Sequence, residues 1–579
     1  MNKIVKSLVA IGITSALTLP AVNAATYQVV DKGDVDSLKY TYAQQENNLG
    51  ETAVSGSDTY NFPVQFQYLD EDDYDSIVSI ADRQHELVHE LNDIEDEDAL
   101  RAGNPTANDL AWAIRFLESI GNSRYQKVGD VVAMVNLGGE TEEFVVFDTT
   151  FEGTDTLTRS TTDYINGITD EGLIYGNASA PYLPLDFVES DGDEVTHWVR
   201  DFATRAFFTL NHGETIQEIV PPVSDYYGGE SAILDVNGLT AVGYVSNKLN
   251  PDRAEDILDT TGGCSDPDIL EDLPFEVCVQ NISSDLYHFV AYQWTIDPTE
   301  GTVSEKELGL LVTPSEGDDR EFRSYAQAVN AHGVAVGFSH GWVDEEETDP
   351  SDNESRSFYA VVYKNDEVIS FTQDHSEYFD SRAYDISDNG IAVGHVNTFV
   401  NGNLRTKFYH VDTNLPASEM TMEFPDDYFE GSSSTARAIN ERGFIVGEGE
   451  VETHNSSSKP RRTHGFIYDI NAKTFTDLND FLSCDTAYTI IEARDINENN
   501  EISATAIVKA PRRDSKGELM FGDDGEQLVE DVVRAVTLKP VDGEIEDCSE
   551  VEETIERKGA SFGIGLFALL ITLGFRRKL

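Results

Sequence analysis

One arrangement of apolar and polar positions recurs along the chain. An apolar residue is followed by two or three polar residues, then a glycine, then an alternating apolar run that ends at a second glycine. The clearest copies occupy 329–337, 386–394 and 439–447. Further copies lie at 168–176, 236–243 and 496–504, where the last has lost both glycines, and 47–56 matches less closely. Such a recurrence indicates a repeat architecture, in which each copy forms the same supersecondary unit.

The chemistry of this phrase predicts a tight hairpin. The apolar residue ends one strand, the polar residues turn the chain, and the first glycine takes a left-handed conformation that other residues resist. Gly172, Gly333, Gly390 and Gly443 hold this position, and Asn500 replaces glycine in a later copy. Asparagine tolerates that conformation next best, which supports a backbone reason for the position. The second glycine is expected where two backbones crowd together.

The spacing of the copies predicts a β-propeller. Successive turn positions at 333, 390, 443 and 500 are 57, 53 and 57 residues apart. Strand-like runs such as 357–363, 368–371, 407–411 and 465–468 lie between them, which gives about four strands per unit. Four strands suit a propeller blade, whereas the coils of a parallel β-solenoid, the alternative, are shorter. We therefore expect a mostly β domain over 25–545 with about six to seven four-stranded blades, in which 27–30 closes the ring against 535–538.

Three segments interrupt the repeat. Residues 70–120 place apolar side chains on one helical face and predict a small helical insertion. Residues 250–285 form an acidic loop that contains two cysteines, and 510–530 is a charged segment that predicts a long exposed hairpin.

The charge of the chain limits its partners. Lys and Arg number 40 and Asp and Glu 107, which gives a formal net charge of −67. A nucleic-acid-binding protein needs a basic footprint, so the composition argues against nucleic acid as a partner. It argues equally against docking on anionic lipid through a basic face.

Both ends of the sequence predict export. A positive start, an apolar run over 7–19 and small residues up to Ala24 form a signal peptide at 1–24, with cleavage after Ala24. After an acidic spacer at 546–558, the segment 559–579 carries an apolar run that would span about 24 Å as a helix, against a hydrocarbon core of about 30 Å. The closing Arg576–Lys578 favours a cytoplasmic end. We expect an envelope protein that is anchored in the inner membrane by this C-terminal hydrophobic helix or processed to the cell surface.

Cysteine usage is consistent with export. The four cysteines are Cys264, Cys278, Cys484 and Cys548, an even number that suggests two disulfides. Three pairings are possible. Cys264–Cys278 is favoured because its loop is short and lies within one insertion, which leaves Cys484–Cys548. No Cys-x-x-Cys pair is present, which argues against a metal site at these residues.

Two resemblances accompany these features. The tail Gly559-Ala560-Ser561-Phe562-Gly563, followed by an apolar stretch and Arg-Arg-Lys, resembles the GlyGly-CTERM sorting tails of Gram-negative bacteria, with Gly-Ala in place of Gly-Gly. That resemblance implies a rhomboid-type sorting protease and the secretion machinery as partners. The repeat phrase resembles the HAF repeats of bacterial extracellular proteins. Over 27–579 the chain resembles an uncharacterised exported family built from such repeats, which supplies no activity or site residues.

One motif could carry chemistry. His85-Glu86-Leu87-Val88-His89 lies on a predicted helix, where two histidines four residues apart can bind zinc with Glu86 as the general base. Asp109 is a candidate third ligand. The charged flanking residues Arg83 and Glu90 are unusual for a zinc protease, and the alternative is the solvated face of an acidic helix.

Other polar motifs favour structural explanations. The acidic runs 70–73 and 191–194 could bind Ca²⁺ weakly, but neither has the spacing of an EF-hand loop. The string 337–341 matches a nucleophile elbow, yet it overlaps the repeat phrase and should be a coincidence. In 197–208, Arg200, Arg205 and Asp201 predict a buried ion pair among aromatic residues, with an anion or sugar pocket that uses Trp198 as its platform as the alternative.

The sequence thus favours an exported, non-catalytic binding or interaction protein whose ligand it does not identify. Whether the chain is an enzyme stays open. One alternative is a zinc metallohydrolase centred on His85 and His89. Another is a propeller enzyme acting on polysaccharide through paired carboxylates that the sequence does not single out.

Overall fold

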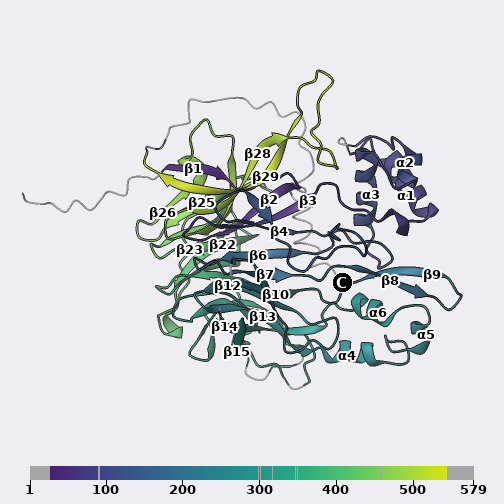
Figure 1. Cartoon of the computed structure of the whole chain (residues 1–579). Coiled ribbons are helices and arrows are strands. Elements are labelled where there is room, and N and C mark those ends of the chain that lie inside the picture. The colour runs from purple at the N-terminus through teal and green to yellow at the C-terminus, as the bar shows by residue number, and fades with distance from the viewer. Residues whose placement is uncertain are drawn as a thin grey trace, which may run out of the picture.

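The computed structural model describes residues 26–545, apart from 89, 90, 211, 298, 300, 316, 346, 348, 349, 352, 455, 457, 458 and 544. Seven antiparallel sheets form the blades of a β-propeller (Figure 1), which confirms the predicted fold class and gives the blade count. The signal peptide with Ala24, the acidic spacer and the C-terminal hydrophobic helix lie outside the described residues. Within them, no helix is long and apolar enough to cross a membrane.

Each blade is built from strands that follow one another in the sequence. The first three blades are β2 (Leu38–Glu46), β3 (Thr52–Thr59), β4 (Val132–Asn136) and β5 (Thr141–Glu143); β6 (Asp163–Ile168), β7 (Ile174–Ala178), β10 (Arg205–Leu210) and β11 (Thr215–Ile219); and β12 (Ser231–Asn237), β13 (Thr240–Leu249), β14 (Tyr287–Asp297) and β15 (Thr302–Gly309). The next three are β16 (Ser324–Val329), β17 (Ala335–Trp342), β18 (Arg356–Lys364) and β19 (Glu367–Ser370); β20 (Ser381–Ile386), β21 (Ile391–Val400) and β22 (Asn403–Asp412); and β23 (Ser434–Ile439), β24 (Phe444–Glu450), β25 (Thr463–Asp469) and β26 (Thr474–Asp477). In the fifth blade a single bridge between His410 and Glu423 marks the place of a fourth strand.

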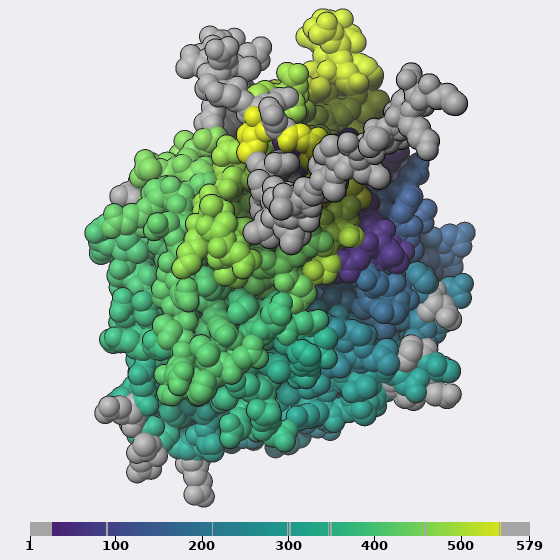
Figure 2. Space-filling view, turned by 90° about the vertical axis from the view of Figure 1, so that its left-hand side faces the viewer, coloured from purple at the N-terminus to yellow at the C-terminus, as the bar shows by residue number. Residues whose placement is uncertain are grey.

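The two ends of the domain meet in the seventh blade. This blade combines β27 (Thr489–Ile496), β28 (Ile502–Pro511) and β29 (Val529–Val541) with the N-terminal strand β1 (Thr26–Asp31). Val29 is paired with Leu538, as the sequence predicted. The first strands of neighbouring blades contact one another all round the ring, so they are the innermost strands. Figure 2 shows the chain passing round this ring in sequence order, from purple through teal and green to yellow.

The hydrophobic core lies between the blades. Apolar side chains from one sheet pack against those of the next, as Val362 of the fourth blade does with Ile386 and Tyr409 of the fifth. Burial of this alternating apolar face stabilises the ring at about 25 cal/mol per Å² of apolar surface.

The repeat phrase forms the turn between the first and second strand of each blade. The φ angles are +81° at Gly172, +73° at Gly333, +80° at Gly390, +82° at Gly443 and +61° at Asn500. The left-handed conformation predicted for this position is therefore confirmed. The two weaker copies also have it, because their glycines at 50 and 238 have φ angles of +82° and +59°.

The second glycine of the phrase faces a bulge in the first strand. A Cβ atom on Gly337 would lie 1.9 Å from the carbonyl oxygen of Tyr325, and one on Gly394 would lie 1.9 Å from that of Arg382. Register shifts in the first strands bring these carbonyls close. The predicted crowding of backbones is confirmed. In the seventh blade Ala504 occupies this position, and the first strand there has two register shifts instead of one.

At most of the boundaries between blades, a buried side-chain hydroxyl accepts a backbone hydrogen bond from the preceding blade. Ser324 accepts the N–H of Ala291 from the preceding blade at 2.9 Å and donates to the carbonyl of Gly309 at 2.7 Å. Equivalent N–H groups of the preceding blade are accepted by Thr41, Ser231, Ser381 and Ser434. The second blade has Asp163 at this place, paired with Ala178 on the adjacent strand.

The insertions predicted from the sequence are confirmed as elements. The helical insertion contains α1 (Glu71–Gln84), α2 (Glu97–Arg101) and α3 (Ala107–Ser119), preceded by a short η1 (Phe66–Tyr68), and has a core of its own around Trp112 and Ile77. The cysteine-containing loop holds α4 (Pro251–Leu258), α5 (Pro267–Leu270) and α6 (Phe275–Asn281). The charged segment is a hairpin with bridges between Arg513 and Leu519 and between Phe521 and Gln527. Two strands, β8 (Leu183–Val188) and β9 (Glu194–Val199), form a further hairpin in the second blade, and η2 (Ala417–Glu419) and η3 (Leu478–Phe481) are short helical turns.

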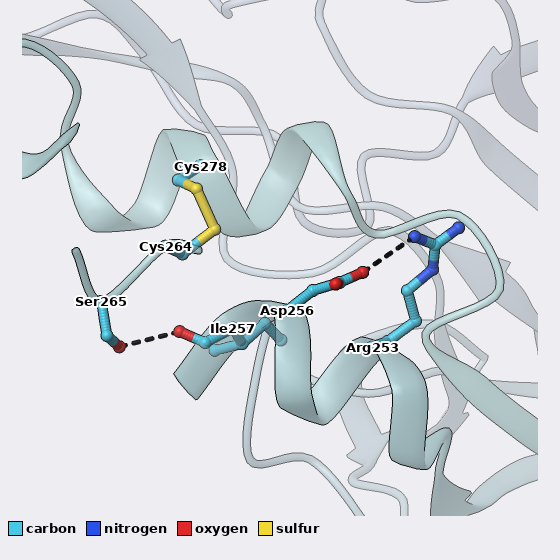
Figure 3. Close-up of a disulfide and its surroundings, with 6 residues drawn as sticks. All are labelled: Arg253, Asp256, Ile257, Cys264, Ser265 and Cys278. Atoms are coloured by element: carbon cyan, nitrogen blue, oxygen red, sulfur yellow. Dashed lines mark hydrogen bonds and ion pairs between the residues drawn. A yellow bond between two sulfur atoms is a disulfide. The ribbon is translucent and has the colours of Figure 1, made fainter. Parts of the chain in front are cut away.

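The favoured disulfide is present. Cys264 is bonded to Cys278, with Cα atoms 5.5 Å apart, and joins α6 to the segment after α4 (Figure 3). Cys484 is also in a disulfide. Cys548, the partner that the predicted pairing assigns to it, lies outside the described residues.

Candidate functional site

The two faces of the propeller ring differ in construction. One face, which we call the turn face, carries the seven repeat turns. Side chains of these turns join neighbouring blades: the amide of Asn440 donates to the carbonyl of Asn497 at 3.1 Å, and that of Asn497 donates to the carbonyl of Asn47 at 3.1 Å. Asn330 makes the same bond to Ser387 at 3.3 Å. This face is closed by short, mutually bonded turns.

The opposite face carries all the long connections between second and third strands, and we call it the loop face. These connections are the helical insertion, the β8–β9 hairpin, the cysteine-containing loop, the segments 343–355 and 451–462 and the hairpin 512–528. In the fifth blade, the long strands β21 and β22 are joined at this face by the short turn 401–402. Figure 1 shows the helical insertion, the β8–β9 hairpin and α4–α6 on the same side of the molecule. Binding residues are concentrated on loops held by a rigid scaffold, so the loop face is the candidate functional surface.

Arginine and aromatic side chains from the first and second strands of neighbouring blades contact one another near the loop face. Arg382 of the fifth blade lies over Phe338 of the fourth, 4.8 Å from the ring centre. Arg437 of the sixth blade lies over Tyr384 of the fifth at 5.3 Å. Tyr325 of the fourth blade meets Tyr244 of the third with ring centres 5.0 Å apart. These contacts form a continuous band across four blades, which we call the arginine–aromatic band.

Carboxylates hold part of this band in place. Arg437 binds Glu448 through two nitrogens, at 3.0 and 2.7 Å, and lies 3.8 Å from Glu492 of the seventh blade. Arg494 lies 3.6 Å from the same Glu492. Burial raises the pKa of Glu448, and the positive charge of Arg437 opposes that shift. Fixed guanidinium and aromatic groups can bind planar or charged groups without rearranging, but they provide no nucleophile.

Three partly buried carboxylates lie at equivalent positions deeper in the ring. Asp235, Asp385 and Asp495 each accept a backbone N–H from the next blade, at 2.8, 2.7 and 3.1 Å. Burial raises the pKa of Asp385 to about 8 and that of Asp495 to about 7, and repulsion from Asp235 adds to both shifts. Sequence reasoning missed this set. The sequence feature that could have revealed it is an aspartate directly before the apolar residue that begins the repeat phrase, present in alternate copies.

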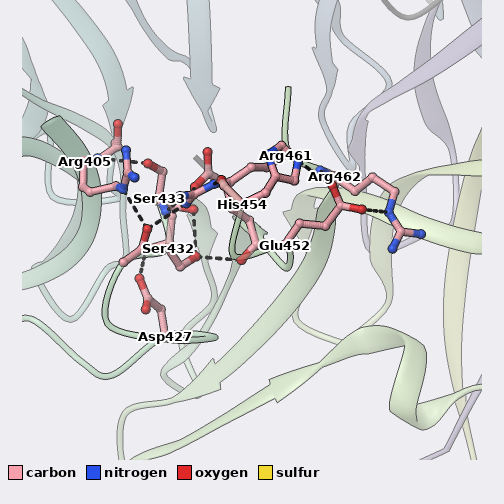
Figure 4. A network of polar contacts seen from close by, with 12 residues as sticks. Arg405, Asp427, Ser432, Ser433, Glu452, His454, Arg461 and Arg462 are labelled. Atoms are coloured by element: carbon pink, nitrogen blue, oxygen red, sulfur yellow. Dashed lines mark hydrogen bonds and ion pairs between the residues drawn. The ribbon is translucent and has the colours of Figure 1, made fainter. Parts of the chain in front are cut away.

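A polar network fixes the segment 451–462 on the loop face (Figure 4). Arg461 donates to the carbonyls of His454 and Gly431 at 2.7 and 2.8 Å and pairs with Glu450. Glu452 accepts from Arg462 at 2.6 Å and contacts His454 at 3.1 Å. Because the carboxylates and guanidinium groups of this network engage one another and backbone carbonyls, it serves to hold the loop.

The helix that would carry the zinc motif ends before the motif. Helix α1 ends at Gln84, and the ring of His85 contacts the carbonyl of Ala81 at 3.0 Å. Glu86 follows in a turn, whereas the expectation placed it on the helix. Asp109 is fully buried, and its two oxygens accept the N–H groups of Glu95 and Asp96 at 2.9 Å each. His89 lies outside the described residues, and within them no group of three potential ligands could hold a metal ion.

The remaining sequence motifs serve the fold. Asp70 caps α1, and its carboxylate accepts the N–H of Asp73 at 2.9 Å. The string 337–341 lies within strand β17. It therefore lacks the strand-to-helix turn that a nucleophile elbow requires. Trp198 is completely buried, so it is not a platform for a sugar. Arg205 pairs at 3.1 Å with the exposed Glu218, which lies outside the segment, and not with the Asp201 of the predicted pair.

Comparison with known proteins identifies the chain by family alone. A family described as "Protein of unknown function (DUF3466)" matches residues 3–578. Among curated proteins, none matches this sequence.

Solved structures with a similar arrangement are distant. An oligogalacturonate lyase from Vibrio parahaemolyticus is 9% identical, with 72% of this chain and 89% of that chain covered and a TM-score of 0.31. A Trypanosoma rangeli sialidase in complex with sialic acid is 12% identical, with 70% and 56% covered and a TM-score of 0.27. A puromycin-hydrolysing peptidase from Mycobacterium tuberculosis is 10% identical, with 67% and 53% covered and a TM-score of 0.26. Likenesses at this level carry no information about activity.

Proposed function

The chain belongs to the DUF3466 family of proteins of unknown function, and we propose that it is an exported, non-catalytic binding protein of the cell envelope. Its ligand docks on the loop face, over the arginine–aromatic band. The inner membrane, a rhomboid-type sorting protease and the secretion machinery are its partners during export.

The observation that carries this proposal is the asymmetry of the ring. All the long connections between second and third strands emerge on the loop face, while the turn face is closed by bonds such as that of Asn440 to Asn497. A protein that served only as a spacer would have no reason to place every insertion on one side. Loops of this length on a rigid scaffold are typical of recognition surfaces.

The chemistry of the band favours binding over catalysis. Arg382 and Arg437 are held by stacking and ion pairs, so they present charge and planar surface in a fixed place. Preorganised groups bind with little loss of conformational entropy. A sugar or polymer segment that bears planar or negatively charged groups would find complementary contacts there.

A binding screen with matched variants tests the proposal. Mature protein purified from cells would be applied to an array of envelope polysaccharides and other glycans, with a readout for binding and a second readout for cleavage. Arg382→Met alters the band, whereas Arg442→Met removes an exposed arginine from a repeat turn on the opposite face. We expect a bound glycan whose affinity falls at least tenfold in Arg382→Met and is unchanged in Arg442→Met. Cleavage of the glycan, or loss of binding only in Arg442→Met, would contradict the proposal.

A further inference from the structure

A cluster of hydrogen-bond donors lies where the third and fourth blades meet at the loop face. His288 is at the start of β14, His340 is near the end of β17, and Arg356 begins β18. All three side chains gather around Phe322. The guanidinium of Arg356 lies 4.7 Å from the Phe322 ring centre, and the His340 ring lies 6.0 Å from it. Phe322 is fully buried, so these groups surround a fixed centre.

Backbone hydrogen bonds determine the tautomer of both histidines. The N–H of Phe322 donates to Nδ1 of His288 at 3.4 Å, and the N–H of Arg323 donates to Nδ1 of His340 at 2.9 Å. A ring nitrogen that accepts cannot carry the proton, so each neutral ring carries its proton on Nε2. Both imidazoles therefore present an N–H donor on the side away from the backbone.

Positive neighbours keep these rings neutral. Burial lowers the pKa of His288 to about 4, and the charges of Lys248 and Arg356 add to the effect. Burial lowers the pKa of His340 to about 3, with contributions from Arg356, Arg323 and Arg320. At neutral pH both remain donors without adding charge of their own.

Two of the donors have no acceptor. Nε2 of His288 and Nη1 of Arg356 are buried without a hydrogen-bond partner among the described residues, and His288 is 7% exposed. A buried donor without a partner is costly, and in native proteins it usually indicates a bound water, ion or ligand. Groups that can only donate require an acceptor, and an anionic oxygen is the strongest one available.

The ion pairs described around the cluster involve the other two arginines and not Arg356. Arg320 pairs with Asp318 at 2.7 Å. Arg323 pairs with Glu321 and lies 3.3 Å from Asp285. In the part of the chain that the structure describes, Arg356 has no carboxylate within ion-pair distance. The guanidinium of Arg356 therefore stands outside these ion pairs and is available to an external anion.

We propose that Arg356, His288 and His340 form a binding site for an oxyanion group, a carboxylate or sulfate, of the ligand. The site deepens the proposed binding role and rests on it in assigning the group to the natural ligand. Oxygens of the anion accept from Nη1 of Arg356 and from the Nε2–H groups of the histidines. This chemistry favours a ligand that carries acidic groups, such as an acidic polysaccharide, over a neutral one.

Sulfate binding to the mature protein tests the site without the natural ligand. Sodium sulfate would be titrated calorimetrically at constant ionic strength into wild type, Arg356→Met, His288→Gln and the control Arg442→Met. We expect saturable binding to wild type and the control, and a loss of at least tenfold in affinity in the two site variants. Sulfate also stabilises proteins by exclusion from their surface, but that effect does not saturate and is shared by all variants.

A measurement on wild type covers the case in which the variants do not fold. The side-chain ¹⁵N resonances of the histidines report the tautomer and the acceptor at Nε2. Sulfate should shift two histidine Nε2 resonances with the same midpoint as the calorimetric titration. Absence of saturable binding to wild type, or equal binding by wild type and Arg356→Met, would overturn the inference. If glycan binding still depended on Arg382, the proposed function would stand without this site.

Discussion

The side-chain amide of Asn497 in the seventh blade donates to the backbone carbonyl of Asn47 in the first blade at 3.1 Å. The two residues are 450 positions apart in the sequence. The same bond links Asn47 to Thr169, Asn330 to Ser387, and Asn440 to Asn497. In these four turns the asparagine that begins the turn therefore has a second role, because it joins its blade to the next one along the ring.

Replacing Asn497 with alanine should destabilise the ring at its closure. The substitution removes this buried hydrogen bond and also the acceptor for the N–H groups of Asn499 and Glu501, which should cost about 1–3 kcal/mol. Urea unfolding of the mature protein would measure the change, with the exposed Asn403→Ala as control. Equal midpoints for the two variants would show that these bonds do not stabilise the closure.

Replacing Gly337 with alanine should destabilise the protein far more than the addition of one methyl group suggests. The new Cβ would lie 1.9 Å from the Tyr325 carbonyl, so the bulge in the first strand would have to shift. We expect a loss of more than about 2 kcal/mol in the free energy of unfolding. Gly121→Ala is the control, because no atom lies within 4 Å of the added Cβ there. If urea unfolding gave Gly337→Ala as small a loss of free energy of unfolding as Gly121→Ala, the crowding explanation of the second glycine would be wrong.

Asp163 should make stability fall as the pH rises. It occupies the place of the bridging serines, one of its oxygens has no partner, and burial raises its pKa from 3.8 to about 8. The folded state therefore holds a proton that the unfolded state has already released, so stability is greatest at acid pH and decreases up to about pH 8. This pKa shift corresponds to a decrease of up to about 6 kcal/mol in the free energy of unfolding.

The variant Asp163→Ser restores the residue type of the other blades and should remove this pH dependence. Thermal unfolding of wild type and variant would be compared at pH 5 and pH 8.5, with the exposed Asp155→Ser as control. We expect the variant to be clearly more stable than wild type at pH 8.5 and to differ less at pH 5. An advantage that is equal at both pH values would contradict a titrating Asp163.

The Cys264–Cys278 bond should stabilise its insertion without determining the propeller fold. The two residues are separated by 14 positions, and a loop of this length is worth about 3 kcal/mol in the chain-entropy model. In the double variant Cys264→Ser/Cys278→Ser, amide hydrogen exchange should accelerate across 251–281 and stay unchanged in β20–β22. Faster exchange throughout the ring would show that the bond supports the whole fold.

The architecture could be predicted because the turns impose a backbone requirement. Glycine adopts the left-handed conformation most readily and asparagine next, so Gly333, Gly390, Gly443 and Asn500 mark equivalent corners in the sequence. The count of seven was harder to predict, because the copies with Gly50 and Gly238 lack other positions of the phrase. Strand β1 could be assigned because its apolar pattern complements 535–538.

The candidate site could not be predicted in the same way. Arg382 and Phe338 belong to different blades, and their contact depends on how neighbouring sheets pack. The donor cluster at Arg356 depends on which acids remain free after Asp318 and Glu321 have paired. The zinc motif illustrates the opposite error. Its spacing requires a helix, but α1 ends at Gln84, and Leu91 and Ile94 pack onto the same core from a following loop.

Hydrogen exchange of the mature protein, with and without the glycan that binds it most tightly, tests the assignment of function to the loop face most directly. The account predicts protection of amides in loop-face segments such as 401–404 and 512–528. Exchange in the repeat turns 330–333, 387–390 and 440–443 should be unchanged. Protection confined to those turns would contradict it.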